Sequence, residues 1–197
     1  MPRRGDLILR RLLQLLIVVS LLASIGNSQI AKQPQSSEQS RFAVEGIPIE
    51  KPKDVPESVL KILRKDDYVA GCLKQGQSAS EIPASWFVGS EIHLDGSDQI
   101  DLIVVPRQLA PRKDEPTDNA CLYGANVAPF WVFSKASGQP TLVLEISAAG
   151  LKVLNAKTNG YRDIRTWSST AQTRTTSYFR FDRHQYKLAA RKAKPAQ

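Results

Sequence analysis

The sequence predicts an α+β fold, in which one N-terminal helix packs on an antiparallel β-meander sheet. Two observations support this class. Val55, Val59 and Ile62 recur at helical spacing near the start of the domain. After Cys72 the apolar pattern changes to period two, and short turns separate the apolar segments. Strands joined by short turns pair antiparallel, because parallel neighbours need a longer crossover.

The helix is expected to start near Asp54. Asp54 and Glu57 have the spacing of a capping box, and Pro56 suits a first helical turn. Asp66 and Asp67 are expected to end it.

The strands that follow differ in how many of their faces are apolar. The apolar run at 100–105 is broken only by Asp101, which predicts a central strand buried on both faces. Asn159-Gly160 is a strong signal for a two-residue hairpin turn. The expected strands run through residues 86–94, 100–105, 130–133, 141–146, 151–157, 161–167, 178–181 and 186–188.

Residues 1–28 read as a secretory signal peptide. Four arginines precede an apolar run at 12–25, and small residues follow it. The run is shorter than the roughly 20 residues of a membrane span. We therefore expect a periplasmic or secreted protein, and a membrane contact only if the segment is retained as an uncleaved anchor.

The rest of the chain divides into three parts. Residues 29–53 are polar and are expected to form a disordered linker. Residues 54–188 form a single domain with 16 basic and 15 acidic side chains, and 189–197 form a basic disordered tail. Because the domain is nearly neutral, we expect no nucleic-acid partner, although the net charge of the chain is +8.

The chain has two cysteines, Cys72 and Cys121. An even count in an exported protein predicts a disulfide bond, and only one intramolecular pairing exists. The alternative is a pair of buried free thiols. Neither cysteine belongs to a C-x-x-C motif, so a zinc or redox role is not indicated.

An acidic turn lies between two expected strands, in the segment HLDGSDQIDL at 93–102. The segment resembles the calcium loop D-x-N-G-D-G-x-x-D-L of FG-GAP, integrin-like repeats. The resemblance implies candidate metal ligands at Asp95 and Asp101. Asp98 stands where the family has its second glycine, so it is a further candidate that is out of register. His93 and Ser97 stand where the family has carboxylates, so we expect weak calcium binding or none. The alternative is a tight β-turn built by Asp and Gly.

A second resemblance covers about residues 55–188. The chain resembles a group of uncharacterised exported bacterial proteins in six places. These are Trp86-Phe87, the acidic turn, Cys121, residues 131–133, residues 158–164 and residues 178–186. That resemblance implies compartment and architecture only.

Tyr161, Arg165 and Trp167 alternate along one expected strand and should share a face. Arginine beside aromatic rings suits a glycan surface through stacking and forked hydrogen bonds. We therefore predict a ligand-binding face at these three residues. The alternative is a half-buried sheet whose outer face is covered by arginines.

The sequence contains no H-E-x-x-H, G-x-S-x-G or phosphate-cradling glycine motif. We identify no cofactor and no catalytic residue. The function expected is an exported, non-catalytic binding or inhibitor-like module acting on an envelope glycan or a protein partner. The alternative is a hydrolase of an envelope polymer that uses carboxylates near Asp95–Asp101.

Overall fold

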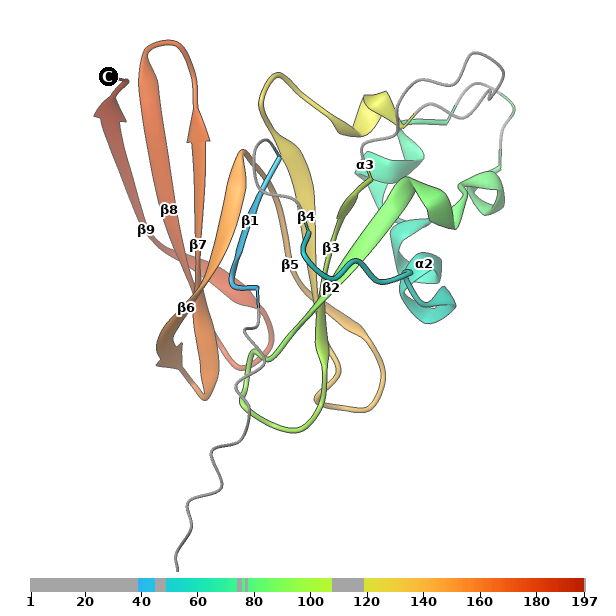
Figure 1. The fold of residues 1–197 in the computed structure, drawn as a ribbon, viewed down its shortest axis with the longest axis horizontal. Coiled ribbons are helices and arrows are strands. Elements are labelled where there is room, and N and C mark those ends of the chain that lie inside the picture. The colour runs from blue at the N-terminus through green and yellow to red at the C-terminus, as the bar shows by residue number, and fades with distance from the viewer. Residues whose placement is uncertain (1–38, 45–48, 74–75, 77, 108–118, 197) are drawn as a thin grey trace, which may run out of the picture. The chain divides into compact units, whose positions relative to one another are not determined.

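A computed structural model describes residues 39–44, 49–73, 76, 78–107 and 119–196. These residues form two antiparallel sheets and a few short helices, so the domain is mostly β. The helices lie beside one sheet, on the side away from the other sheet (Figure 1). The sequence predicted a single sheet. The strands instead form two sheets. The chain passes from one sheet to the other at Ala149, the single residue between two long strands that belong to different sheets.

The sheet next to the helices, sheet B, has four strands in the order in which they follow along the chain. They are β2 (Phe87–Ile92), β3 (Asp101–Pro106), β4 (Ala128–Ser134) and β5 (Thr141–Ala148).

The other sheet, sheet A, has five strands in the order β1-β6-β7-β8-β9. Strands β6 to β9 are a meander, and the short β1 pairs with the edge of β6. The strands are β1 (Arg41–Ala43), β6 (Gly150–Thr158), β7 (Tyr161–Ser169), β8 (Thr173–Phe181) and β9 (Tyr186–Pro195).

The helices are short: α2 spans Glu57–Leu63 and α3 spans Asp67–Ala70. Three single-turn 3₁₀ helices cover Ala79–Glu81, Ala84–Trp86 and Ala120–Leu122. The predicted capping box is wrong, because the residue that caps α2 is Pro56, which makes no side-chain hydrogen bond there. Asp66 caps α3 instead, and its carboxylate accepts hydrogen bonds from the amides of Tyr68 and Val69. None of the helices in the described ranges has the length and apolar character that a bilayer crossing requires.

Sheet B is buried on both faces, because its central strands contribute alternate residues to two cores. Phe130 and Val132 of β4 face sheet A, whereas Trp131 and Phe133 face the helices. Strand β3 behaves in the same way, which confirms the prediction of a doubly buried strand. The core between the sheets includes Phe42, Ile103, Leu151, Ile164 and Phe179. The core under the helices includes Val59, Leu63, Val69, Phe87 and Leu102.

Two local predictions are confirmed. Asn159 and Gly160 both have positive φ angles, 51° and 87°, and join β6 to β7 as the two-residue hairpin turn. Cys72 and Cys121 form a disulfide bond with their Cα atoms 5.5 Å apart. The bond ties the segment after α3 to the 3₁₀ turn that precedes β4.

Parts of the predicted linker and tail are ordered strands in the structure. Residues 41–43 of the linker form β1, which pairs with residues 150–152. Residues 189–195 of the tail extend β9 along the whole of β8. Both segments gain order from long-range pairing with a neighbouring strand, which local composition does not reveal. The signal segment lies outside the described residues.

Candidate functional site

The outer face of sheet A, away from the core, carries a groove of about 350 Å³. Because Ile164 and Thr166 of β7 are buried, the residues that alternate with them face outward into this groove. Of the described residues that line it, five are cations, two are aromatic and none is acidic. We call this site the basic groove; its lining residues are Arg41, Arg165, Trp167, Arg174, Thr176, Tyr178, Lys192 and Lys194.

Strand pairing places like charges directly opposite one another across this face. Arg41 pairs with Lys152 of β6, and Lys152 pairs with Arg165 of β7, so three cations form one row across three strands. Further along the sheet, Arg174 pairs with Lys194. Like charges at directly opposite positions destabilise a sheet. The arrangement therefore concentrates positive charge at a cost to stability.

The two aromatic rings of the basic groove are each contacted by a cation. The guanidinium of Arg41 stands 5.3 Å from the centroid of the Trp167 ring, and the same ring lies over the backbone of Gly150. The ammonium of Lys192 stands 5.8 Å from the centroid of the Tyr178 ring. These contacts hold the cations in place over the sheet and occupy ring surface that a ligand would otherwise stack on.

The structure brings together two of the three residues predicted to form the ligand-binding face. Arg165 and Trp167 both line the basic groove. Tyr161 lies elsewhere: its ring stacks on Phe181 with centroids 3.9 Å apart, and its hydroxyl is 3.2 Å from Oγ of Ser134. Tyr161 therefore packs against the core between the sheets and closes one end of it.

Sequence reasoning missed Arg41, Lys192 and Lys194 as members of the site. All three were assigned to a disordered linker or tail, because their neighbourhoods are polar and contain few β-forming residues. One signal was available: Arg191, Lys192 and Lys194 follow directly on the expected strand at 186–188. A continuation of that strand would have placed basic residues beside β8.

The acidic turn between β2 and β3 is held by hydrogen bonds within the protein. The Asp101 carboxylate is buried, and its two oxygens accept hydrogen bonds from the amides of Leu94, at 2.8 Å, and Lys135, at 3.0 Å. Burial raises the pKa of Asp101 although these hydrogen bonds oppose the shift. Asp95 accepts from the amide of Ser97, and Asp98 is exposed. Asp101 thus joins this turn to the turn that follows β4.

A second group of carboxylates lies where β5 faces the helices. Glu145 of β5 lines a hollow with Asp66 and Asp67 at the start of α3. Partial burial, together with the charges of Asp66 and Asp67, raises the pKa of Glu145 to about 7. The second oxygen of Asp66 accepts a hydrogen bond from the Trp131 indole at 3.1 Å. This group anchors α3 to sheet B and is the most perturbed carboxylate cluster among the described residues.

Within the described part of the chain, no three His, Cys, Asp or Glu side chains are placed to hold a metal ion together. Comparison of the chain with models of protein families, with curated proteins and with solved structures found no match. The resemblances drawn from the sequence therefore stay predictions.

Proposed function

We propose that this protein is a non-catalytic binding module, acting outside the cytoplasm, that holds an anionic envelope polymer in the basic groove. The observation that carries the proposal is the row Arg41–Lys152–Arg165, in which three cations stand opposite one another on neighbouring strands. A binding surface for a polyanion requires this concentration of positive charge, whereas the fold does not.

No carboxylate in the described part of the chain neutralises the positive charge of the groove. Among the described residues, Arg165, Arg174 and Lys194 form no ion pair with a carboxylate. The nearest acidic residue along β7, Asp163, lies 3.7 Å from Arg180, which is outside the groove lining. A solvated sheet face with no ligand would be expected to mix charges of both signs. The excess therefore supports an anionic ligand.

The covered aromatic rings favour charge recognition over stacking. A neutral sugar or a nucleic-acid base is held mainly through the faces of aromatic rings. Here Arg41 and Lys192 stand over the rings of Trp167 and Tyr178. The groove therefore offers fixed cations spread over several strands, which suits a chain of repeated sulfate, phosphate or carboxylate groups.

Two features support a location outside the cytoplasm: the signal-peptide pattern and the disulfide bond. Disulfide bonds persist mainly in oxidising compartments. The Cys72–Cys121 bond is consistent with export. In that compartment, acidic polymers of the cell envelope carry the negative charge that the groove would bind. An acidic protein surface is the second candidate ligand.

The alternative, a carboxylate-based hydrolase near Asp95–Asp101, has less support. Both oxygens of Asp101 accept backbone hydrogen bonds, and Asp95 is engaged by Ser97. A general acid or nucleophile must present its carboxyl group to the substrate. These two carboxylates instead shape the turn that carries them.

Binding of dextran sulfate and of neutral dextran of the same length, measured by calorimetry, tests the proposal. We expect dextran sulfate to bind, to weaken as salt rises, and to lose at least about tenfold in affinity in the variant Arg165→Gln/Arg174→Gln/Lys194→Gln. Lys53→Gln, which removes a cation from the segment beside sheet B, is the matched control and should bind normally. Equal binding of both polymers, or an unaffected triple variant, would contradict the proposal. Tighter binding of a single-stranded oligonucleotide than of dextran sulfate would contradict the choice of an envelope polymer.

A further inference from the structure

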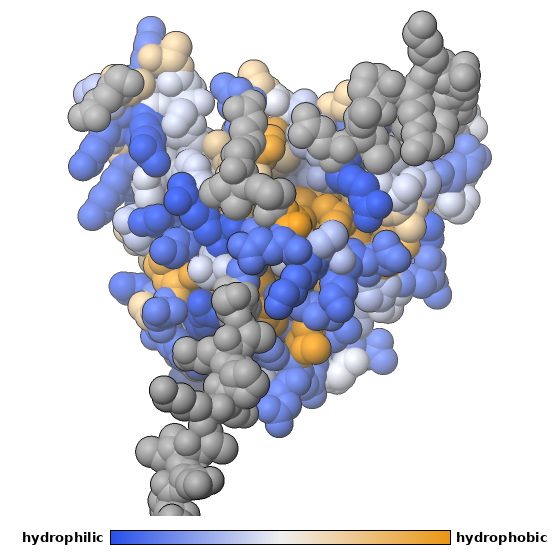
Figure 2. Space-filling model, in the orientation of Figure 1, coloured by the Kyte–Doolittle hydropathy of each residue, from blue (hydrophilic) through white to orange (hydrophobic). Residues whose placement is uncertain are grey.

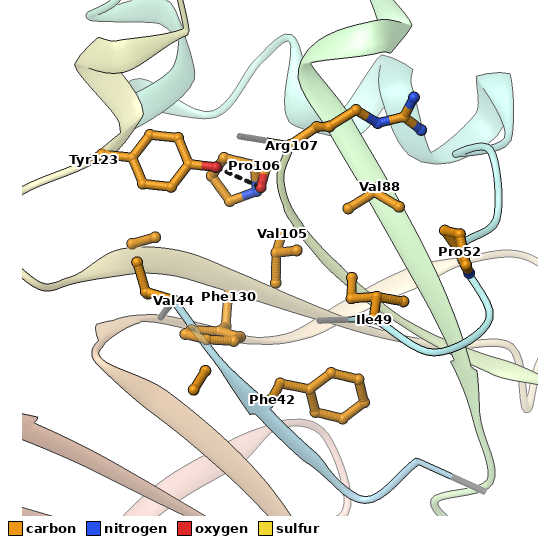
Figure 3. A pocket seen from close by; sticks show the side chains of 12 residues that line it. Phe42, Val44, Ile49, Pro52, Val88, Val105, Pro106, Arg107, Tyr123 and Phe130 are labelled. Atoms are coloured by element: carbon orange, nitrogen blue, oxygen red, sulfur yellow. Dashed lines mark hydrogen bonds between the residues drawn. The ribbon is translucent and has the colours of Figure 1, made fainter. Parts of the chain in front are cut away.

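A cavity of about 430 Å³ opens between the two sheets, on a side of the domain different from the basic groove. Figure 3 shows its side chains, which come from β1, β2, β3, β4 and the segments next to them. In Figure 2, hydrophobic surface is visible in the middle of this face, whereas the part over β7 to β9 is mainly hydrophilic. Its lining includes Phe42 of β1, Val88 of β2, Val105 of β3 and Phe130 of β4.

The cavity is lined mainly by apolar side chains. The Tyr123 hydroxyl donates to the carbonyl of Pro106 at 2.7 Å, so it is already satisfied (Figure 3). Burial raises the pKa of Tyr123 to about 12, which keeps the phenol neutral. The volume of the cavity falls in the range of about 300–1,000 Å³ that is usual for ligand pockets. Such a site favours an apolar ligand body.

Among the described lining residues, Arg107 is the one that carries a charge. Its backbone is fixed, since its amide donates to Trp86 and its carbonyl accepts from the side chain of Asn119. Its side chain is 39% exposed and lies 3.7 Å from Asp54, whose side chain is fully exposed. An ion pair in that setting is weak and screened, so a ligand carboxylate can replace Asp54.

We propose that this cavity binds one single-chain, fatty-acid-type carboxylate, with its acyl chain between the sheets and its carboxylate on Arg107. Valines at 44, 88 and 105 leave the space open, whereas Phe42, Ile49 and Phe130 supply apolar contact along it. The charge at the mouth selects a carboxylate over a neutral or cationic amphiphile. This inference does not depend on the polymer-binding function, because none of the residues that line the cavity lines the basic groove.

Displacement of a fluorescent fatty acid by dodecanoate tests the site directly. We expect saturable displacement, with affinity falling about fourfold for each methylene removed between dodecanoate and octanoate. Dodecanol should bind more weakly than dodecanoate. No saturable displacement, or an affinity that does not change with chain length, would overturn the proposal.

Variants separate this cavity from other apolar surfaces. Val105→Phe fills the cavity and should abolish displacement; Val44→Phe, at the residue after β1, also fills it and serves if the first variant does not fold. Arg107→Gln should weaken dodecanoate about fivefold and leave dodecanol unchanged. Arg165→Gln is the matched control: it should leave dodecanoate unchanged while weakening dextran sulfate. Full binding in both filled variants, or equal loss of dodecanoate and dodecanol in Arg107→Gln, would overturn the assignment.

Discussion

The indole ring of Trp167 lies directly over the backbone of Gly150, so a Cβ atom added to Gly150 would overlap Cζ2 of the ring. The two residues pair across β6 and β7. Glycine is required here because the ring occupies the space of a side chain, and the ring in turn covers backbone that glycine leaves bare. The pair fixes the position of an aromatic ring in the basic groove.

Gly150→Ala should therefore destabilise the fold by about 1–3 kcal/mol, because the ring of Trp167 must move. Trp167→Ala should cost less than the roughly 3–5 kcal/mol of a fully buried tryptophan, because its ring is only partly buried. Urea unfolding of both single variants and the double variant measures the coupling. We expect the double variant to be more stable than the sum of the single changes predicts. Additive effects would show that the contact does not constrain Gly150.

Asp101→Ala should destabilise the protein by about 2–4 kcal/mol, because it leaves the buried amide of Leu94 and the partly buried amide of Lys135 without an acceptor. Asp98→Ala is the matched control in the same turn. Asp98 is exposed, so its loss should change stability by less than about 0.5 kcal/mol. Similar costs for the two variants in denaturant melts would argue against the anchoring role of Asp101.

Calcium should not raise the melting temperature. The oxygens of Asp101 already accept two backbone hydrogen bonds, and a metal would have to displace them. Thermal melts with calcium and with a chelator check this expectation. A clear shift that disappears in Asp95→Asn would instead establish the acidic turn as a calcium site.

The stability of the fold should fall as pH rises through the range in which Glu145 loses its proton. Its pKa is about 7 in the folded protein and 4.5 as the reference for the unfolded chain, so the folded state holds the proton more tightly. The carboxyl group is protonated in both states below the lower value, and ionisation above it favours the unfolded chain. The melting temperature should therefore drop between about pH 5 and pH 8, and Glu145→Gln should reduce that drop. The same change at the exposed Glu91, which pairs with Lys53, should leave the drop intact.

Replacing both cysteines by alanine should lower the free energy of unfolding by about 4 kcal/mol, because the bond between Cys72 and Cys121 closes a loop of about 50 residues. Thiol labelling of the denatured, unreduced protein should detect no free thiol. Detection of two thiols in protein from the native host would mean that the bond does not form there.

Several features of this protein follow from short stretches of its chain. Asn159-Gly160 specifies its turn because two consecutive positive φ angles are tolerated there with little strain. The continuous apolar run at 130–133 specifies a strand because its large apolar side chains on both faces must be buried. The single pair of cysteines leaves one intramolecular bond to form.

Other features exist only because distant segments meet. A period-two apolar pattern identifies a strand but does not show to which sheet the strand belongs. The pattern therefore could not predict that the chain passes from sheet B to sheet A at Ala149. Strand β1 is only three residues long and β9 is rich in lysine and alanine, so local composition does not identify them as strands, and each is ordered by pairing with a long neighbouring strand. Arg41 and Lys194, 153 positions apart, share the basic groove for that reason. Tyr161 does not join the predicted face because its ring stacks on Phe181 of β8, a contact that alternation along β7 does not reveal.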